Sequence, residues 1–343
     1  MPINNFSPYI IAEMSGNHNQ SLQKALELVE AAANAGAHAI KLQTYTADTI
    51  TMNCATDHFM INDEKSLWHG RKLHDLYQEA HTPWDWHKPI FDKAKSLGID
   101  CFSSPFDFTA VDFLEQFDPP FYKVASFEIT HIPLIKKCAQ TGRPLIISTG
   151  MATKQEIQEA YDTAIQYGAS SVTLLKCTSQ YPADASDANL NTMQDMQASF
   201  PKAQIGLSDH TMGIGVAIAA TCMGAQMIEK HFTLNRADGG VDSAFSLEPH
   251  ELKMLVSETK KAAISMGQIK YGGTDNEANS RKFRQSIWIN SSLKVGDILT
   301  EDNIKICRPN VGLSPNAYYD ILGKKINQNV EAGVPVTENL IAS

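Results

Sequence analysis

Eight short apolar runs recur along the first two thirds of the chain, and they constrain its fold more than any other feature. They are YIIAE (9–13), AIKLQT (39–44), DCFSS (100–104), YKVAS (122–126), LIISTG (145–150), VTLLKCTS (172–179), IGLSDH (205–210) and MIEKHF (227–232). Several of these runs are nearly continuous in apolar residues, which is typical of strands buried on both faces of a parallel sheet.

Helical patterns lie between most of these runs, for example LQKALELVEAAANAG (22–36) and KQEIQEAYDTAIQYG (154–168). Gly36 and Gly168 stand where such helices should end. Eight strands that alternate with helices over about 250 residues predict a (β/α)8 TIM barrel within the α/β class. A doubly wound parallel sheet is the structural alternative that the pattern leaves open.

The barrel pattern stops near Met266, so we expect a barrel domain over residues 1–266. Residues 267–282 are polar and rich in Gly and Asn, which indicates a linker. Residues 283–343 contain short β-like pieces and turn signals, and they predict a small β-rich domain. A domain of about 60 residues is marginal alone, so it should lean on the barrel or on another subunit.

Composition limits the partners of the chain. With 343 residues, 43% hydrophobic and 20% charged, it reads as an ordinary globular protein. Its net charge of −9 argues against non-specific binding to nucleic acid or to a membrane surface. The scattered cysteines include no C-x-x-C pair, and the N-terminus lacks the basic start and long apolar run of a signal peptide. We therefore expect reduced thiols and a cytoplasmic location.

One connection, from Tyr45 to about Pro83, is much longer than the others. Long insertions in compact domains are usually functional loops or lids, and the alternative here is a covering helix, LHDLYQEA. Both can hold. The histidines that cluster in this loop lack metal-binding spacing, so we expect surface or loop residues at His58, His69, His74, His81 and His87.

Polar residues stand at the ends of the predicted strands, where (β/α)8 barrels build their active sites. In chain order they are Glu13, Lys41, Gln43, Ser103, Ser104, Lys123, Ser126, Ser148, Thr149, Ser179, Ser208, Asp209, His210, Glu229, Lys230 and His231. A buried charge needs a partner or a ligand, so the lysines in this set are expected to serve a site and not packing. For any single one, a buried ion pair or a solvated rim is the alternative.

Two of these residues, His210 and His231, end adjacent strands at matched positions. Two neutral imidazoles facing one opening could hold a divalent metal such as Mn²⁺, Mg²⁺, Co²⁺ or Zn²⁺. A hydrogen-bonded histidine and a separate rim histidine are the alternative. The surrounding lysines and hydroxyls are typical of a site for phosphate or carboxylate.

The strand-end motifs also carry a resemblance. IIAEMSGNHNQSL, IKLQTYT, CFSSPF, YKVASFE, PLIISTGMAT, LKCTSQYP, IGLSDHTMG and IEKHFTL, in that order, resemble the sialic acid synthase family of phosphoenolpyruvate-dependent nonulosonate synthases. The tail, with KVGDILTEDNIKICRPNVGL, resembles the family's C-terminal antifreeze-like (SAF) domain. The long loop, with SLWHGRKLHDLYQEAHTPWDWH, resembles the branch that makes pseudaminic acid. CTSQYP does too, because neuraminate synthases usually carry Asn at the position of Ser179.

The resemblance implies a reaction and a set of roles. The enzyme would condense phosphoenolpyruvate with an amino-sugar aldehyde, 2,4-diacetamido-2,4,6-trideoxy-L-altrose in the pseudaminic acid branch, and release phosphate by C–O cleavage. His210 and His231 would hold the metal. The residues that would hold phosphoenolpyruvate, with Glu229 beside it, are Lys41, Lys123, Ser104, Ser126, Ser148 and Ser208. Ser179 stands at the phosphate site, and Glu13 would handle a proton.

The same resemblance implies that Gln43, Tyr181 and Asp242 touch the sugar, although Asp242 could be a simple loop residue. Arg308 would reach from the small domain into the barrel of a neighbouring subunit, which implies a homodimer. An intrachain surface arginine is the alternative there.

Several rival functions remain at this point. The nearest are N-acetylneuraminate and legionaminic acid synthases, which use a different amino-sugar. A Schiff-base aldolase with Lys123 or Lys41 as nucleophile would use pyruvate without a metal. A metal-dependent hydrolase would need more ligands than two histidines, and a non-catalytic binding protein would not need the ring of polar strand ends.

Overall fold

The computed structural model describes residues 7–64 and 66–342, and the chain divides into two compact units, Met1–Gly267 and Gln268–Ser343. The first six residues lie outside the described ranges, and the expectation of no signal peptide rests partly on them. Among the described residues, no helix is long and apolar enough to cross a membrane.

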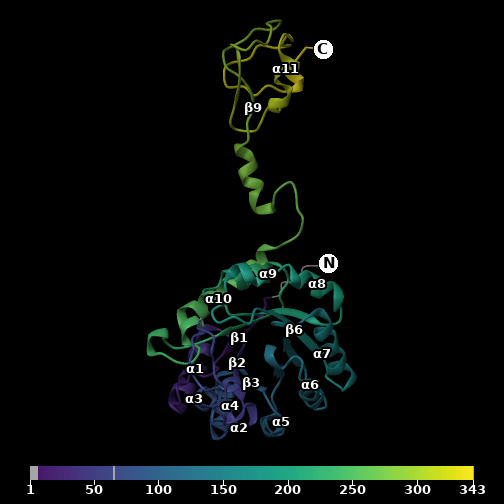
Figure 1. Ribbon diagram of the computed structural model, residues 1–343. Coiled ribbons are helices and arrows are strands. Elements are labelled where there is room, and N and C mark those ends of the chain that lie inside the picture. Colours follow the sequence, from purple (N-terminus) through teal and green to yellow (C-terminus); the bar gives the residue numbers. More distant parts are fainter. Residues whose placement is uncertain (1–6, 65, 343) are drawn as a thin grey trace. The chain divides into compact units, whose positions relative to one another are not determined.

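The first unit is built on eight parallel strands that close into a barrel in chain order, and Figure 1 shows the helices outside this ring. The strands are β1 (Tyr9–Glu13), β2 (Ala39–Thr44), β3 (Asp100–Pro105), β4 (Tyr122–Val124), β5 (Leu145–Ser148), β6 (Val172–Cys177), β7 (Gln204–Asp209) and β8 (Met227–His231). The prediction of a (β/α)8 barrel is therefore confirmed, and the doubly wound sheet is wrong.

The helices of this unit are α1 (Leu22–Ala35), α2 (Ala47–Ile50), α3 (Leu73–Ala80), α4 (His87–Leu97), α5 (Phe108–Leu114), α6 (Ile132–Ala139), α7 (Lys154–Gln166), α8 (Thr192–Ser199), α9 (Gly215–Cys222) and α10 (Pro249–Ser265). Their ends follow from local chemistry. The side chain of Ser21 accepts a hydrogen bond from the Lys24 backbone at the start of α1, and Gly36 ends that helix at φ 88°. The covering helix predicted in the long loop is α3.

The alternation of side chains along each strand decides which residues meet. Six apolar residues form a separate cluster inside the barrel: Ile11, Ala39, Phe102, Ile146, Leu175 and Met227. Successive side chains of a strand point to opposite faces, so the residues two positions further on share this inward direction. They are Glu13, Lys41, Ser104, Ser148, Cys177 and Glu229. The inside of the barrel thus changes from apolar to polar within two residues along each of these strands.

The second unit contains a two-stranded antiparallel sheet, β9 (Ser286–Ile289) with β10 (Ile304–Cys307), and a short helix, α11 (Tyr318–Ile321). Its own apolar core includes Ile287, Ile289, Leu299 and Ile304. Residues 267–282, which the sequence indicates as a linker, carry part of a 3-10 helix, η8 (Asp275–Phe283).

Candidate active site

Four buried charged side chains from β1, β2, β4 and β8 meet at the carboxyl ends of the strands. The Lys41 ammonium lies 2.6 Å from Glu13 Oε2 and 3.8 Å from Glu229 Oε2. The Lys123 ammonium lies 3.8 Å from Glu229 Oε1. All four residues are at most 5% exposed, and the structure brings them together at one site, as the sequence predicts.

Serine hydroxyls surround these charges, as the strand-end pattern predicts. Lys41 donates to Ser104 Oγ at 3.2 Å, and Lys123 donates to Ser148 Oγ at 2.7 Å. Ser208 donates to Glu229 Oε1 at 3.0 Å. Lysines that hydrogen-bond small hydroxyls in a buried place present point charges together with neutral donors, which is what a phosphate or carboxylate needs.

Burial and mutual charge shift the pKa values within this cluster. Burial raises the pKa of Glu13, and the two neighbouring charges, Lys41 and Glu229, act in opposite directions on it. Burial opposes the carboxylate form of Glu229, but Lys123 and Lys41 outweigh burial and lower its pKa. Burial lowers the pKa of Lys123, whereas Glu13 and Glu229 hold the pKa of Lys41 above its usual value against burial. The cluster therefore holds Lys41 charged and leaves Lys123 short of negative partners.

Several buried polar atoms of this region have no hydrogen-bond partner among the described residues. They are Oε2 of Glu13 and Oε2 of Glu229, which both have an ion-pair contact with Lys41, together with Nδ1 of His231 and Oε2 of Glu128. Buried polar groups in native proteins are nearly always hydrogen-bonded, so a cluster of such atoms marks a place for a ligand.

Gly150 brings its main chain close to two of the predicted serines. A Cβ atom at Gly150 would lie 2.1 Å from Ser179 Oγ and 2.7 Å from Ser126 Oγ. The backbone N–H of Gly150 donates to Ser126 Oγ at 3.1 Å. Only a residue without a side chain leaves the hydroxyls of Ser126 and Ser179 free to turn toward the same small space.

The two predicted metal-binding histidines lie side by side, with ring centroids 5.2 Å apart. This follows from strand register, because Asp209 pairs with Lys230 and the next residue on each strand is a histidine. His210 Nδ1 lies 2.8 Å from the Thr178 carbonyl, to which it can only donate, so Nε2 keeps its lone pair. His231 Nδ1 lies 3.6 Å from Asp242 Oδ2.

These contacts fit a divalent metal. Metal-binding histidines usually direct their second nitrogen to a carbonyl or a carboxylate. His210 does so toward the Thr178 carbonyl, and the Asp242 carboxylate lies 3.6 Å from His231 Nδ1, without a hydrogen bond. Burial keeps the pKa of His231 well below its usual value, which favours the neutral ligand form. Burial also opposes charge on His210, but Cys177, whose sulfur lies 3.8 Å from Nδ1, the Thr178 carbonyl and Glu229 together outweigh burial and raise its pKa.

The remaining predicted sugar-binding residues of the barrel also reach this centre. Gln43 donates to Glu13 Oε1 at 2.9 Å. The ring of Tyr181 lies 4.4 Å from that of His210. Asp242 is 8% exposed and accepts from the Ser15 hydroxyl, so it is a buried residue of the site and not a simple loop residue.

Arg308 belongs to the second unit. There it lines a pocket together with Phe283, Arg284, Asn310 and Ser314. Its predicted contact with a sugar in the barrel stays a prediction.

Three strand-end residues face away from the barrel interior, contrary to the sequence expectation. Lys230 is 1% exposed, pairs with Asp209 at 2.8 Å and donates to the carbonyls of Thr211 and Gly213. It is a packing ion pair, so the expectation that every strand-end lysine serves the site is wrong for Lys230. Ser103 also points outward, where it bonds to Thr44.

The expectation for the loop histidines is wrong at His87. This side chain is 0% exposed, at the start of α4, and its Nε2 lies 2.7 Å from Thr44 Oγ1. Burial lowers its pKa to about 4. His87 is buried because it belongs to the buried face of α4. The composition of the loop does not predict this.

The sequence analysis missed Glu128. This residue lies on a 3-10 turn, η4 (Ser126–Glu128), directly after β4, and burial raises its pKa to about 7 while Lys123 opposes the shift. The acidic residue two positions after Ser126 in YKVASFE was the available signal. Glu128 lies beyond the predicted strand end at Ser126, so the pattern of strand ends does not include it.

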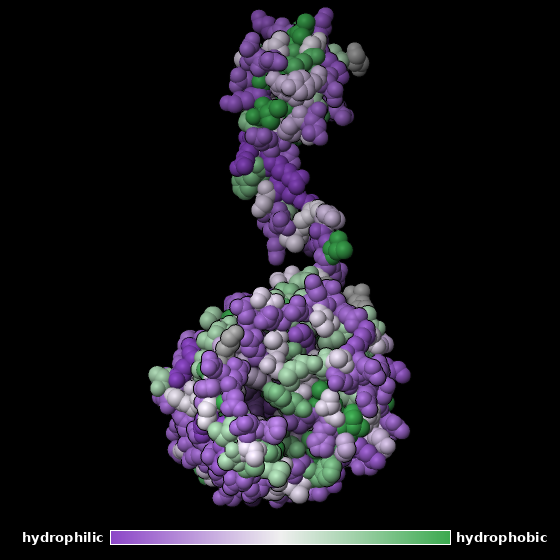
Figure 2. Space-filling view, in the orientation of Figure 1, coloured by the Kyte–Doolittle hydropathy of each residue, from purple (hydrophilic) through white to green (hydrophobic). Residues whose placement is uncertain are grey.

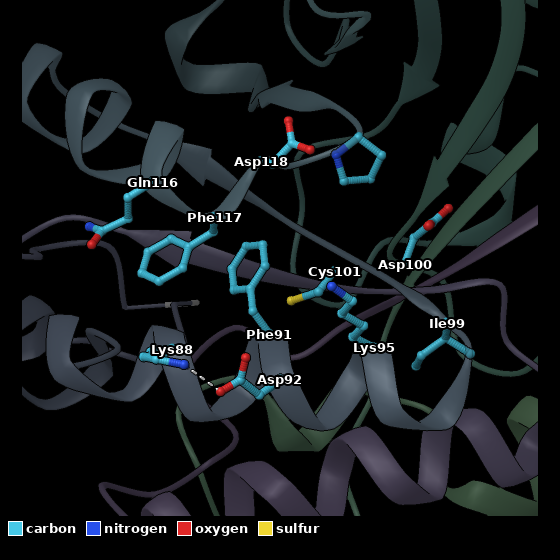
Figure 3. Close-up of a pocket in the computed structure, with 11 residues that line it drawn as sticks. Lys88, Phe91, Asp92, Lys95, Ile99, Asp100, Cys101, Gln116, Phe117 and Asp118 are labelled. Atoms are coloured by element: carbon cyan, nitrogen blue, oxygen red, sulfur yellow. Dashed lines mark hydrogen bonds and ion pairs between the residues drawn. The ribbon is translucent and has the colours of Figure 1, made fainter.

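A cavity of about 520 Å³ at the other ends of the strands contains none of the predicted residues (Figure 3). It is lined by the start of β3, by α4 and by the segment around Phe117. The rings of Phe91 and Phe117 stack there at 4.9 Å, and Lys88 pairs with Asp92. The space-filling view shows a hollow on the visible face of the barrel unit (Figure 2).

Comparison with known proteins agrees with this geometry. Residues 28–271 match the NeuB family, and residues 284–342 match the SAF domain. The chain belongs to the NeuB family. The resemblance to the sialic acid synthase family and the prediction of an antifreeze-like C-terminal domain are thereby confirmed.

Relatives within this family match nearly the whole chain. The pseudaminic acid synthase of Helicobacter pylori is 41% identical over 331 residues, which cover 96% of each chain. The pseudaminic acid synthase of Campylobacter jejuni serotype O:23/36 is 39% identical over 99% of each chain. The N,N'-diacetyllegionaminic acid synthase of Campylobacter jejuni is 38% identical over 93% of this chain and 96% of its own.

A solved structure shares the fold over most of the chain. The N-acetylneuraminic acid synthetase of Leptospira borgpetersenii, in complex with citrate, has a TM-score of 0.70 at 31% identity and covers 81% of this chain and 91% of its own. The prediction that this protein is an enzyme of the nonulosonic acid synthase family is confirmed by these relatives.

Proposed function

We propose that this protein is a pseudaminic acid synthase, which condenses phosphoenolpyruvate with 2,4-diacetamido-2,4,6-trideoxy-L-altrose and releases phosphate. The observation that carries the proposal is the buried Lys41–Glu229–Lys123 cluster beside the two histidines. Three pseudaminic acid synthases at 39% to 41% identity support this choice of sugar.

The chain's own residues can bind and orient phosphoenolpyruvate. Lys41 and Lys123 offer two cations for its phosphate and carboxylate, and the hydroxyls of Ser104 and Ser148 already bond to these ammonium groups. Ser126 and Ser179 would add neutral donors beside Gly150. Because the two lysines are buried, each of their contacts is stronger than it would be at the surface.

The reaction needs a new C–C bond between C3 of phosphoenolpyruvate and the sugar aldehyde carbon. Water then adds at C2, and the bond from C2 to the phosphate oxygen breaks. A divalent ion held by His210 and His231 would supply Lewis-acid polarisation of the aldehyde oxygen. Glu13, with its raised pKa, can carry or accept a proton near neutral pH, and it lies in register with both Lys41 and His231.

Phosphate release is the direct test. We would measure it with phosphoenolpyruvate and Mn²⁺, comparing N-acetylmannosamine with the 2,4-diacetamido-6-deoxy isomers of altrose and mannose, each with and without EDTA. Turnover of the altrose isomer alone, lost in EDTA, is expected. Turnover of another sugar would instead assign the protein to the neuraminate or legionaminic branch.

Variants of the cluster sharpen this test. Lys123→Met should abolish turnover. Lys137→Met removes a half-exposed ion pair between Lys137 on α6 and Asp112 on α5, and it should leave turnover unchanged. Full activity of Lys123→Met would contradict the proposed binding of phosphoenolpyruvate.

One observation favours a second candidate, a Schiff-base aldolase. Burial lowers the pKa of Lys123, and a desolvated lysine is a better nucleophile. Its contacts with Ser148 and Glu229 instead suit a bound anion. Incubation with pyruvate and borohydride decides between them, because a covalent adduct on Lys123 would support the aldolase.

We further propose a homodimer in which Arg308 completes the barrel site of the partner. Arg308→Ala and His210→Ala should each be inactive, and mixing the two under exchange conditions should restore part of the activity. Activity that stays absent in the mixture, with dimers formed, would place Arg308 in its own chain's site.

A cytoplasmic location is proposed because all six cysteines are free thiols. Cell fractionation tests it. Recovery of the protein outside the fraction that carries a cytosolic marker would contradict it.

A further inference from the structure

An aromatic ladder leads from the two histidines to the long loop between β2 and α4. The ring of Tyr181 lies 4.4 Å from His210, and the ring of Phe245 lies 5.0 Å from His231. Tyr181 and Phe245 are 5.4 Å apart. The indole of Trp68, a residue of the long loop, lies 6.0 Å from the ring of Tyr181.

Trp68 is held in place by contacts of its loop backbone and by a hydrogen bond of its indole. Its loop is closed by an isolated β-bridge between Met60 and Lys72, and its own carbonyl accepts from the Arg71 backbone at 3.1 Å. The indole N–H donates to the carbonyl of Val241 at 3.1 Å. Val241 precedes Asp242, whose carboxylate lies beside His231, so Trp68 is tied directly to the segment that borders the candidate metal centre.

This hydrogen bond also decides what Trp68 can offer a ligand. Its single polar hydrogen is used by Val241, so the ring presents carbon only. Phe245 has no polar group, and the ring of Tyr181 between them adds a second aromatic face. The Tyr181 hydroxyl is the other polar group of these three side chains, and it hydrogen-bonds with Ser179. The faces of the three rings therefore offer no donor to a hydroxyl and favour an apolar group.

We propose that Trp68, with Tyr181 and Phe245, forms the subsite for the methyl group at C6 of the sugar and thereby selects a 6-deoxy substrate. The inference rests on the proposed function. With the aldehyde carbon at the two histidines, C6 is the far end of the sugar chain. It is also the one end of the molecule that has no hydroxyl or amide to satisfy. Trp68 stands two ring contacts away from His210, on the side of the long loop.

The test compares two sugars that differ only at C6. Wild-type enzyme is assayed by phosphate release with 2,4-diacetamido-2,4,6-trideoxy-altrose and with its 6-hydroxy counterpart, and the ratio of the two kcat/KM values is the readout. An apolar pocket discriminates against one added hydroxyl by about 10- to 100-fold, which is the expected preference for the 6-deoxy sugar. Trp68→Gln, which places an amide at the wall, should bring this ratio close to one.

Two further variants separate specificity from folding. Trp68→Leu keeps an apolar wall and should retain most of the preference. Trp84→Phe is the matched control, because the Trp84 indole also donates to a backbone carbonyl, that of Tyr45, and stacks on Phe113 away from the ladder. It should leave the ratio unchanged, and the KM for phosphoenolpyruvate should stay the same in all three variants.

The outcomes distinguish the two levels of the argument. A wild-type enzyme that uses neither altrose sugar overturns the proposed function. A wild-type enzyme that prefers the 6-deoxy sugar, with the same preference in folded Trp68→Gln, overturns only the role of Trp68. If Trp68→Gln does not fold, an unchanged ratio in a folded Trp68→Ala variant does the same.

Discussion

Gly150 offers the sharpest test of the proposed phosphate site. Its φ is outside the left-handed region, so an alanine fits the backbone without strain. Its new methyl group, however, would lie 2.1 Å from Ser179 Oγ and 2.7 Å from Ser126 Oγ. Gly150→Ala must therefore push both hydroxyls away from the space between them.

The expected effects on stability and on binding differ in size. A serine hydroxyl can rotate about χ1, and a strained rotamer costs about 0.5–1.5 kcal/mol. Replacing glycine by alanine recovers about 0.4–1 kcal/mol through the unfolded state. The free energy of unfolding should thus change little. Loss of one hydrogen bond to a charged phosphate costs about 1.5–3 kcal/mol, which corresponds to about a 10- to 150-fold weaker affinity for phosphoenolpyruvate.

The assay is steady-state phosphate release at varied phosphoenolpyruvate and saturating sugar, beside urea unfolding of the same samples. Gly215→Ala is the matched control, because a Cβ there would meet nothing within 4 Å and its φ is also ordinary. The KM for phosphoenolpyruvate should rise only in Gly150→Ala. An equal KM in the two variants, both folded, would refute the argument that Ser126 and Ser179 cradle the phosphate.

Three other predictions concern charge and pH. Asp209→Asn leaves the Lys230 ammonium buried without its carboxylate and should lower the free energy of unfolding by about 3–5 kcal/mol, measured by urea titration; a loss below about 1 kcal/mol would mean that the two carbonyl contacts of Lys230 suffice. His231→Asn should weaken Mn²⁺ binding in calorimetry by more than about 100-fold, and unchanged binding would place the metal elsewhere. The pKa of His87 is about 4 in the folded protein and 6.5 in the unfolded chain. The neutral His87 side chain therefore contributes fully to the free energy of unfolding above pH 6.5, and this contribution is lost as pH falls toward 4. This loss is about 3 kcal/mol, and His87→Gln should remove it from urea unfolding compared at pH 7 and pH 4.5.

Strand periodicity carried most of the prediction from sequence. Eight apolar runs and their polar ends were sufficient for the barrel and for the gathering of Lys41, Lys123 and Glu229, because the carboxyl ends of parallel strands meet by topology. His210 and His231 followed in the same way from neighbouring strands.

Two features were not predicted from the sequence: the direction of some strand-end side chains and the geometry of the turns after the strands. Lys230 and Asp209 stand at strand ends too, but they point outward, and the alternation from Ile11 or Met227 would have shown this. Glu128 depends on a 3-10 turn, and the space beside Gly150 depends on how two loops approach each other. Such placements are tertiary, and no local pattern encodes them.

The hydrogen bond from the Trp68 indole to the Val241 carbonyl has a consequence for redesign. It couples two segments that lie 173 positions apart in the chain, one in the long loop and one after β8. A graft of the long loop from a relative with another sugar preference would bring a new side chain to this place but keep the old acceptor. Retargeting the enzyme therefore calls for exchanging both segments as a pair, while the eight strand ends can be left untouched.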